Sequence, residues 1–388
     1  MSLDPRNVLA PACAFGFTAL LALSAGCGSR SGDPESVLFG AEGNRLRAYT
    51  TTGEPRSQIV IEAAAREDGS GGGGPTSDAT LRRDVNGQIC FLPSERRRAR
   101  RFVMGEDTGQ PAVTPGWGVF ELHGVAVGDF SAEQVGRLVT TFQPPAGTAD
   151  PYGCGVLSDG RIVTTDIGNN ASGPATGQLT LWFGPHEGEV TRFCKLDVAI
   201  GTAGGIWVDA EDRIYVASAR DTSGVLRYTG PFPTSNDAVG GCGRTDVTGA
   251  PLADRVNRER FIVADANLPT PNSVAGTSSG EIYVSSVVNG VIAQFDATGA
   301  FVRRILQPPA GETLGFEPYS TGTPLGIAVD RFGTVYYADL GLVVRDGSIG
   351  PGPNTGSDRR IRFVDGEPRP PETFLSGLAF PDGVGVLE

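Results

Sequence analysis

The last strand pattern of the chain reads Phe380-Pro381-Asp382-Gly383-Val384-Gly385-Val386-Leu387. It resembles Pro324-Leu325-Gly326-Ile327-Ala328-Val329-Asp330, a segment that opens a unit of strand, turn and strand. Near the other end, residues 36–39 read as the middle strand of such a unit, with no opening strand before them. Pairing of the two ends would complete this first unit. The sequence therefore predicts a ring of repeats that is closed by its last strand.

Short runs of β-branched and aromatic residues recur along the chain and predict the middle strands of six repeats. They are residues 37–39, 89–91, 162–164, 214–216, 282–284 and 335–337. Turn pairs such as Asn86-Gly87 and Asp159-Gly160 precede the last five, as hairpins require. Inner strands are expected before the middle strands, with third and outer strands after them; the third strand of the last repeat is expected at residues 361–364. The prediction is an all-β, six-bladed β-propeller with four-stranded blades over residues 36–388, its C-terminal strand completing the N-terminal blade.

The composition agrees with this fold class. Of the 388 residues, 56 are glycine and 28 are proline, which favours many turns between short strands. The formal net charge is -12, and an acidic domain repels the phosphate backbone of nucleic acids. Nucleic acid is therefore not an expected partner.

Residues 1–26 have the pattern of a secretory signal peptide, an apolar segment that ends in small residues. Leu23-Ser24-Ala25-Gly26-Cys27 resembles the bacterial lipoprotein box, which implies cleavage before Cys27 and attachment of a lipid there. The alternative is an ordinary signal peptide with an incidental cysteine. In the first case, residues 27–35 form a lipid-anchored tether, and the lipid is the only membrane contact. The protein would then belong to the cell envelope, as an outer-membrane lipoprotein or on the periplasmic or extracellular face.

Four cysteines remain in the predicted propeller: Cys90, Cys154, Cys194 and Cys242. None of them has the close spacing of a metal site. Export to an oxidising compartment favours two disulfides. If the blades follow in chain order, Cys90 with Cys154 and Cys194 with Cys242 would each join neighbouring blades.

Two segments carry a resemblance to a known group. Residues 324–339 resemble the first half of an NHL repeat, and residues 289–302 resemble its second half. Six-bladed propellers similar to it include SMP-30/gluconolactonase-like, paraoxonase-like and strictosidine-synthase-like proteins. The resemblance covers most of residues 36–388 and implies the fold. It does not select an activity, because the group holds lactonases, a lyase-like synthase and pure binding modules.

Loops at one end of the predicted ring carry side-chain oxygens, from Asp166, Asn169, Asn170, Asn272, Asn289, Asp339 and Asp382. Such donors suit Ca²⁺. The resemblance to lactonases of the SMP-30 type, which hold their ion with Glu, Asn and Asp, implies a calcium site made by Asp166, Asn170, Asn272 and Asp382. Asn169, Asn289 and Asp339 would then be ligand-binding neighbours. The same residue types also close turns through hydrogen bonds to the backbone, and this alternative stays open for each.

Other catalytic groups are scarce, with two histidines and the single lysine Lys195. Residues 276–280 fit the pattern G-x-S-x-G, but they are predicted to form a turn between strands, where a nucleophile elbow is not expected. Two hypotheses follow. One is a monomeric binding module that holds a small molecule, an envelope protein or a glycan at the central mouth of the ring. The other is a calcium-dependent hydrolase of lactones or esters.

Overall fold

The computed structural model describes the chain from Val37 to Glu388 with gaps. The described residues are 37–42, 45–50, 57–62, 84–93, 100–107, 116–124, 129–139, 151–168, 175–220, 223–287, 289–308, 323–345, 348–351, 354–378 and 380–388. The predicted signal peptide, the tether and Cys27 lie outside these residues, as do Asn169 and Asn170. Within the described residues there is no α-helix, and so no helix that could span a membrane.

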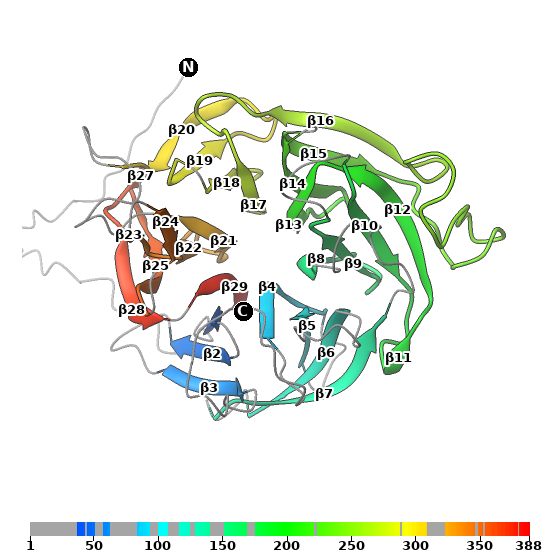
Figure 1. Cartoon of the computed structure of the whole chain (residues 1–388), viewed down its shortest axis with the longest axis horizontal. Coiled ribbons are helices and arrows are strands. Elements are labelled where there is room, and N and C mark those ends of the chain that lie inside the picture. Colours follow the sequence, from blue (N-terminus) through cyan, green and yellow to red (C-terminus); the bar gives the residue numbers. More distant parts are fainter. Residues whose placement is uncertain are drawn as a thin grey trace, which may run out of the picture. The chain divides into compact units, whose positions relative to one another are not determined.

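The strands form six antiparallel sheets set as blades around a central axis (Figure 1). Blade 1 is β29 (Pro381–Leu387), β1 (Val37–Glu42), β2 (Arg45–Thr50) and β3 (Ser57–Glu62). Blade 2 is β4 (Asp84–Phe91), β5 (Arg100–Asp107), β6 (Gly116–His123) and β7 (Ser131–Leu138), with β11 (Gly188–Val190) added in parallel at its outer edge. Blade 3 is β8 (Pro151–Val156), β9 (Ile162–Asp166), β10 (Gly177–Trp182) and β12 (Phe193–Ile200).

The other three blades repeat the same order from the inner to the outer strand. Blade 4 is β13 (Thr202–Val208), β14 (Ile214–Ala219), β15 (Gly224–Thr229) and β16 (Asn257–Val263). Blade 5 is β17 (Pro271–Gly276), β18 (Ile282–Ser286), β19 (Val291–Phe295) and β20 (Phe301–Leu306). Blade 6 is β21 (Pro324–Val329), β22 (Val335–Asp339), β25 (Gly356–Ile361) and β28 (Glu372–Leu378). Two small hairpins accompany it, β23 (Leu342–Arg345) with β24 (Ser348–Pro351), and β26 (Phe363–Val364) with β27 (Glu367–Pro368).

The predicted closure of the ring is confirmed. β29 pairs antiparallel with β1, in a register that sets Leu38 opposite Val386 and Gly40 opposite Val384. In Figure 1 the red β29 accordingly completes the blade that holds the blue β2 and β3. The last strand of the sequence is thus the inner strand of blade 1.

Two predicted strands are placed differently by the structure. Residues 89–91, predicted as the middle strand of blade 2, belong to its inner strand β4, and β5 is the middle strand. Asn86-Gly87 makes no hairpin turn: the pairing of β4 with β5 shifts register there, and Gly87 has φ 71°. A left-handed glycine forms a bulge within a strand as readily as a turn between strands. In blade 6 the third strand is Gly356–Ile361, a few residues before the predicted 361–364.

The core lies between the faces of neighbouring blades. Phe39 of blade 1 and Phe102 and Phe120 of blade 2 are buried in one cluster, and Phe102 stacks on Phe120. Leu181 of blade 3 and Val216 of blade 4 belong to another. Each sheet therefore buries both faces against its neighbours, which a single blade cannot do alone.

An insertion between β15 and β16 ties blade 4 to blade 3. Within it, the N–H of Ala253 donates to the carbonyl of Leu196 on β12 at 2.8 Å. The disulfide Cys194–Cys242 fixes the same insertion to β12. With Cys90–Cys154 between β4 and β8, both predicted disulfides are confirmed, and each joins neighbouring blades.

Candidate ligand site at the ring axis

Four of the six inner strands begin with proline. Their first two residues are Pro151-Tyr152, Pro271-Asn272, Pro324-Leu325 and Pro381-Asp382. Proline has no N–H to donate to the ladder and therefore suits the first position of a strand. Because the blades repeat one topology, all inner strands run the same way along the axis. The residues after the prolines therefore lie at the same end of it.

Three of these residues meet across the axis. The side-chain amide of Asn272 donates to the hydroxyl of Tyr152 at 2.6 Å. That hydroxyl lies 3.5 Å from the backbone carbonyl of Asp382, to which it donates. The N–H of Gly87 donates to Oδ2 of Asp382 at 3.0 Å. We call Gly87, Tyr152, Asn272 and Asp382 the axial cluster; its members come from blades 2, 3, 5 and 1.

The axial cluster combines burial with polarity. Tyr152 is 6% exposed and Asp382 is 4% exposed, whereas Asn272 keeps partial exposure. A buried carboxylate is costly unless hydrogen bonds compensate for the lost water, and the N–H of Gly87 supplies one. The cluster offers a carboxylate, an amide and a phenol to a ligand, a set that can accept from and donate to hydroxyl groups.

Asp166 and Asp339 lie at the same end of the axis but one strand further out, since they end the middle strands. Asp166 pairs in register with Pro151, and Asp339 with Pro324. Oδ1 of Asp166 accepts from the N–H of Gly168 at 3.0 Å, which closes the turn after β9.

Asp339 and Asn289 each bind within their own blade or the loop beside it. Oδ1 of Asp339 accepts from the N–H of Gly341 at 3.0 Å, and Arg359 lies 3.4 Å from Oδ2. Burial raises the pKa of the Asp339 carboxyl. The side-chain amide of Asn289 donates to the carbonyl of Asn267 at 3.3 Å. The contact of Asp339 with Gly341 is the local backbone contact by which Asp stabilises a turn, whereas Asn289 reaches the loop before β17.

Of the four predicted calcium ligands, the structure brings Asn272 and Asp382 together through Tyr152. Asp166 stands on the neighbouring middle strand, and Asn170 lies outside the described residues. Within the described part of the chain, no group of three or more His, Cys, Asp and Glu side chains is placed to hold a metal ion. Within the axial cluster, the side-chain oxygens that fit a hard cation are the carboxylate of Asp382 and the amide oxygen of Asn272.

Two residues that the sequence reasoning did not single out are Tyr152 and Gln88. Alignment of the inner strands on their leading prolines would have found Tyr152, because it occupies the position of Asn272 and Asp382. Gln88 had no such signal. Its role depends on contacts with blades that follow it by 66 and 118 residues.

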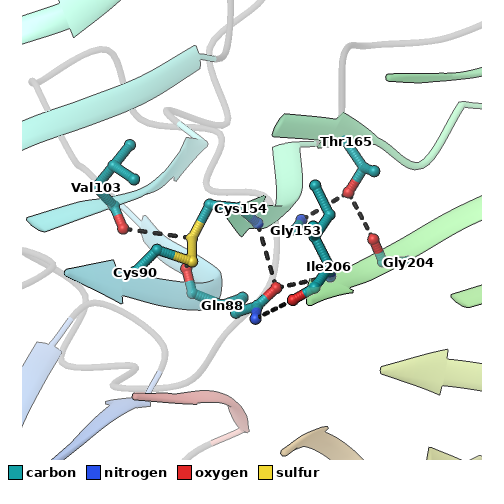
Figure 2. Close-up of a disulfide and its surroundings, with 8 residues drawn as sticks. All are labelled: Gln88, Cys90, Val103, Gly153, Cys154, Thr165, Gly204 and Ile206. Carbon is teal, nitrogen blue, oxygen red and sulfur yellow. Dashed lines mark hydrogen bonds between the residues drawn. A yellow bond between two sulfur atoms is a disulfide. The ribbon is translucent and has the colours of Figure 1, made fainter. Parts of the chain in front are cut away.

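Gln88 fastens blade 2 to blades 3 and 4 near the axis (Figure 2). Its Oε1 accepts from the N–H of Cys154 at 3.2 Å and from the N–H of Ile206 at 2.8 Å. Its Nε2 donates to the carbonyl of Ile206 at 2.6 Å. The amide side chain thus satisfies backbone groups of two inner strands that have no ladder partner on that side.

A hydroxyl on the middle strand makes a second kind of link between blades. Oγ1 of Thr165 accepts from the N–H of Gly153 at 2.9 Å and donates to the carbonyl of Gly204 at 2.6 Å (Figure 2). In blade 5, Ser285 donates in the same way to the carbonyl of Leu325 in blade 6, at 2.7 Å. These links fix the positions of the inner strands that carry the axial cluster.

Lys195 is buried on the outer strand β12, and its Nζ donates to Oγ1 of Thr180 at 3.0 Å. Burial lowers the pKa of Lys195 to about 8 from its ordinary value of 10.5, although the charge of Asp166 acts in the opposite direction. Between these two pKa values the folded chain binds fewer protons than the unfolded chain. The contribution of Lys195 to stability therefore rises as the pH rises through this window.

We expect Lys195→Met to remove this pH dependence. Relative to the variant, the wild-type free energy of unfolding should rise by about 2 to 3 kcal/mol between pH 7.5 and pH 10. Urea unfolding of both proteins across this range measures the difference. If the free energies of unfolding of the two proteins change with pH in parallel, the amine is not desolvated in the folded state.

Neither a protein-family model nor a curated protein matches this chain. Two solved structures that are similar to it are gluconolactonases by description. One is a candidate gluconolactonase, 9% identical, with a TM-score of 0.38 over 78% of this chain and 85% of the other. The second, from Xanthomonas campestris, is described as important in glucose secondary metabolic pathways; it is 12% identical, with a TM-score of 0.40 over 79% of this chain and 84% of the other.

These structural neighbours are gluconolactonase-like proteins. The likeness is weak in both identity and TM-score. At these values of identity and TM-score it carries no weight for the activity of this chain, which has to be inferred from its own residues.

Proposed function

We propose that this protein is an exported propeller of the cell envelope that binds a small hydroxyl-bearing ligand at its axial cluster. The observation that carries the proposal is the meeting of Tyr152, Asn272 and Asp382, from three different blades, at one end of the axis. Ligand sites are concave places where a few convergent polar groups fix the orientation of the ligand. A carboxylate, an amide and a phenol together match the donors and acceptors of a polyol or of a glycan end.

Export and lipid attachment complete this proposal. The apolar leader and the motif that ends in Cys27 support secretion and anchoring, and two disulfides are consistent with an oxidising compartment. The propeller would then act as a monomer held at the membrane by its lipid alone. Labelling of the expressed full chain with a radioactive or clickable fatty acid tests the anchor, with Cys27→Ser as the variant that should lose the label.

The binding site is tested by titrating the purified domain with monosaccharides, sugar lactones and glycan fragments. We expect Asp382→Asn and Tyr152→Phe to weaken binding at least about tenfold, since the first replaces a charged acceptor by a neutral amide and the second removes a hydroxyl, each change being worth about 1 to 3 kcal/mol. Ser278→Ala is the matched control, because Ser278 is exposed in a turn at the opposite end of the axis. Calorimetry gives the affinities.

If Asp382→Asn, Tyr152→Phe and Ser278→Ala all bind the ligand with wild-type affinity, the ligand lies elsewhere on the propeller. A loss confined to Ser278→Ala would point to the pattern at residues 276–280 instead of the axial cluster.

A second candidate function is a calcium-dependent hydrolase of lactones or esters. It is favoured by the presence of Asn272 and Asp382, two of its predicted ligands, in one hydrogen-bonded cluster. A cation there would polarise a carbonyl group, and the residues of this chain would bind and orient the substrate. Calcium calorimetry on the wild-type domain and on an Asp166→Ala/Asn272→Ala variant separates the two functions. Micromolar binding lost in the variant supports the hydrolase; no binding by the folded wild type contradicts it.

A further inference from the structure

The disulfide Cys90–Cys154 joins the two inner strands that carry Gly87 and Tyr152 of the axial cluster. Cys90 follows Gly87 closely on β4, and Cys154 follows Tyr152 closely on β8. The disulfide therefore fixes the spacing between the N–H that holds Asp382 and the hydroxyl that holds Asn272.

Gln88 depends on the same spacing. It lies on β4 between Gly87 and the disulfide, and its Oε1 reaches both Cys154 and Ile206 (Figure 2). Hydrogen bonds of this kind weaken steeply when the donor and acceptor move apart. A shift of β4 relative to β8 would therefore break the bridge to blade 4 as well as the contact of Gly87 with Asp382.

The two disulfides differ in exposure. Cys194 and Cys242 are 0% and 5% exposed, and Cys154 is 1% exposed, whereas Cys90 keeps partial exposure. Thiol–disulfide exchange requires access of a thiolate to one of the sulfurs. The axial disulfide thus contains the most exposed of the four cysteines, and we expect a reductant to reach it first. The rim disulfide, Cys194–Cys242, ties an insertion to the outer strand of blade 3 and holds no residue of the axial cluster.

In the reduced form, the thiol of Cys154 would have hydrogen-bond acceptors close by. Sγ of Cys154 lies 3.3 Å from the carbonyl oxygen of Gln88 and 3.6 Å from that of Val103. A disulfide sulfur carries no hydrogen and cannot donate to these oxygens, but a thiol can. Opening of the bond is therefore compatible with a folded blade interface and does not require the blades to separate.

We propose that Cys90–Cys154 and Gln88 form a redox latch that controls binding at the axial cluster; the proposal rests on the function proposed above. A protein or small-molecule dithiol supplies the electrons. Its thiolate attacks Sγ of Cys90, the S–S bond breaks, and Cys154 leaves as a thiolate that takes up a proton. The second thiol of the reductant then displaces Cys90, which is also protonated. Two cysteine thiols are formed, and the dithiol becomes a disulfide.

Hydrogen–deuterium exchange of the folded protein tests the latch without any ligand. After mild treatment with dithiothreitol, we expect the amides of Gly87, Cys154 and Ile206 to exchange at least about tenfold faster than in the oxidised protein. Cys90→Ser/Cys154→Ser should show the same increase without reductant. Gln88→Met, with the disulfide intact, should show it at Cys154 and Ile206.

The matched control is Cys194→Ser/Cys242→Ser, which opens the rim disulfide only. It should leave the exchange of the three amides unchanged, even where it lowers the unfolding temperature. Two results would overturn the latch. The first is that the three amides keep their protection when the axial disulfide is open. The second is that the rim variant accelerates the exchange of these amides equally, which would mark a general loss of stability.

The binding arm uses the calorimetric titrations described above, with Ca²⁺ and with the best hydroxylated ligand, before and after reduction. We expect a loss of affinity of at least about tenfold on reduction. If neither probe binds the oxidised protein, the proposed function fails, and the exchange experiment still decides whether the disulfide controls the geometry of the axial cluster. Unchanged affinity on reduction contradicts the control of binding.

Discussion

Asp197→Ala is expected to destabilise the propeller by about 1 to 3 kcal/mol, because it leaves the buried hydroxyl of Tyr228 without its acceptor. Asp197 is 0% exposed on β12 of blade 3. Its Oδ2 accepts from the hydroxyl of Tyr228 at 2.8 Å and from the guanidinium of Arg258 at 2.7 Å, both in blade 4. Burial, aided by the charge of Asp197, raises the pKa of Tyr228 well above its ordinary value.

The matched control for this prediction is Glu259→Ala. Glu259 pairs with Arg227 at 2.6 Å across the same two strands, β15 and β16, but it is half exposed. Exposed ion pairs contribute about 1 kcal/mol or less, so the control should cost little. Urea unfolding at pH 7 compares the two variants. Equal costs would show that Asp197 is not an anchor between blades 3 and 4.

Gly383→Ala is expected to cost at least about 4 kcal/mol or to prevent folding, since it belongs to the rare class of substitutions with severe backbone clashes. A β-carbon at Gly383 would lie 1.4 Å from the carbonyl oxygen of Gly87, far inside van der Waals contact. The neighbour is backbone and cannot rotate away. β29 would have to withdraw from β4, the neighbouring inner strand in blade 2.

Gly243→Ala is the control for this effect. A β-carbon at Gly243 would meet its nearest atom, an oxygen of Asp254, at 3.7 Å, which is ordinary contact. Thermal unfolding and gel filtration of the two variants measure the difference. A Gly383→Ala protein with the stability of the Gly243→Ala protein would mean that the two inner strands do not pack as closely as described.

The fold was predictable because its repeats are local. A short apolar run identifies five of the six middle strands, four of them directly after a turn, in residues that are adjacent in the chain, such as 282–284. In blade 2, residues 89–91 were predicted as the middle strand but lie in the inner strand, because Asn86-Gly87 satisfies the rule for a hairpin turn and also the rule for a bulge. Only the pairing partner distinguishes these two cases.

The candidate site was predictable in part. Asn272 and Asp382 were identified as oxygen-bearing residues at one end of the ring and through the resemblance to lactonases of the SMP-30 type, and the structure places both in the axial cluster. Asp166 and Asp339 have the same residue types, yet they stand on middle strands and hold turns. Their local sequence does not show whether the carboxylate lies at the axis or binds the backbone of its own turn, since a residue at the end of a strand can do either.

The sequence by itself determined the class of fold, the number of blades and the closing of the ring, because each follows from the order and spacing of short patterns. Only the tertiary structure decided that Tyr152 joins Asn272 to Asp382 and that Gln88 joins three blades. These contacts join residues that are 66 to 230 positions apart. Hydrogen bonds at the axis depend on how closely six inner strands approach one another, and that approach is set by the packing of the whole ring.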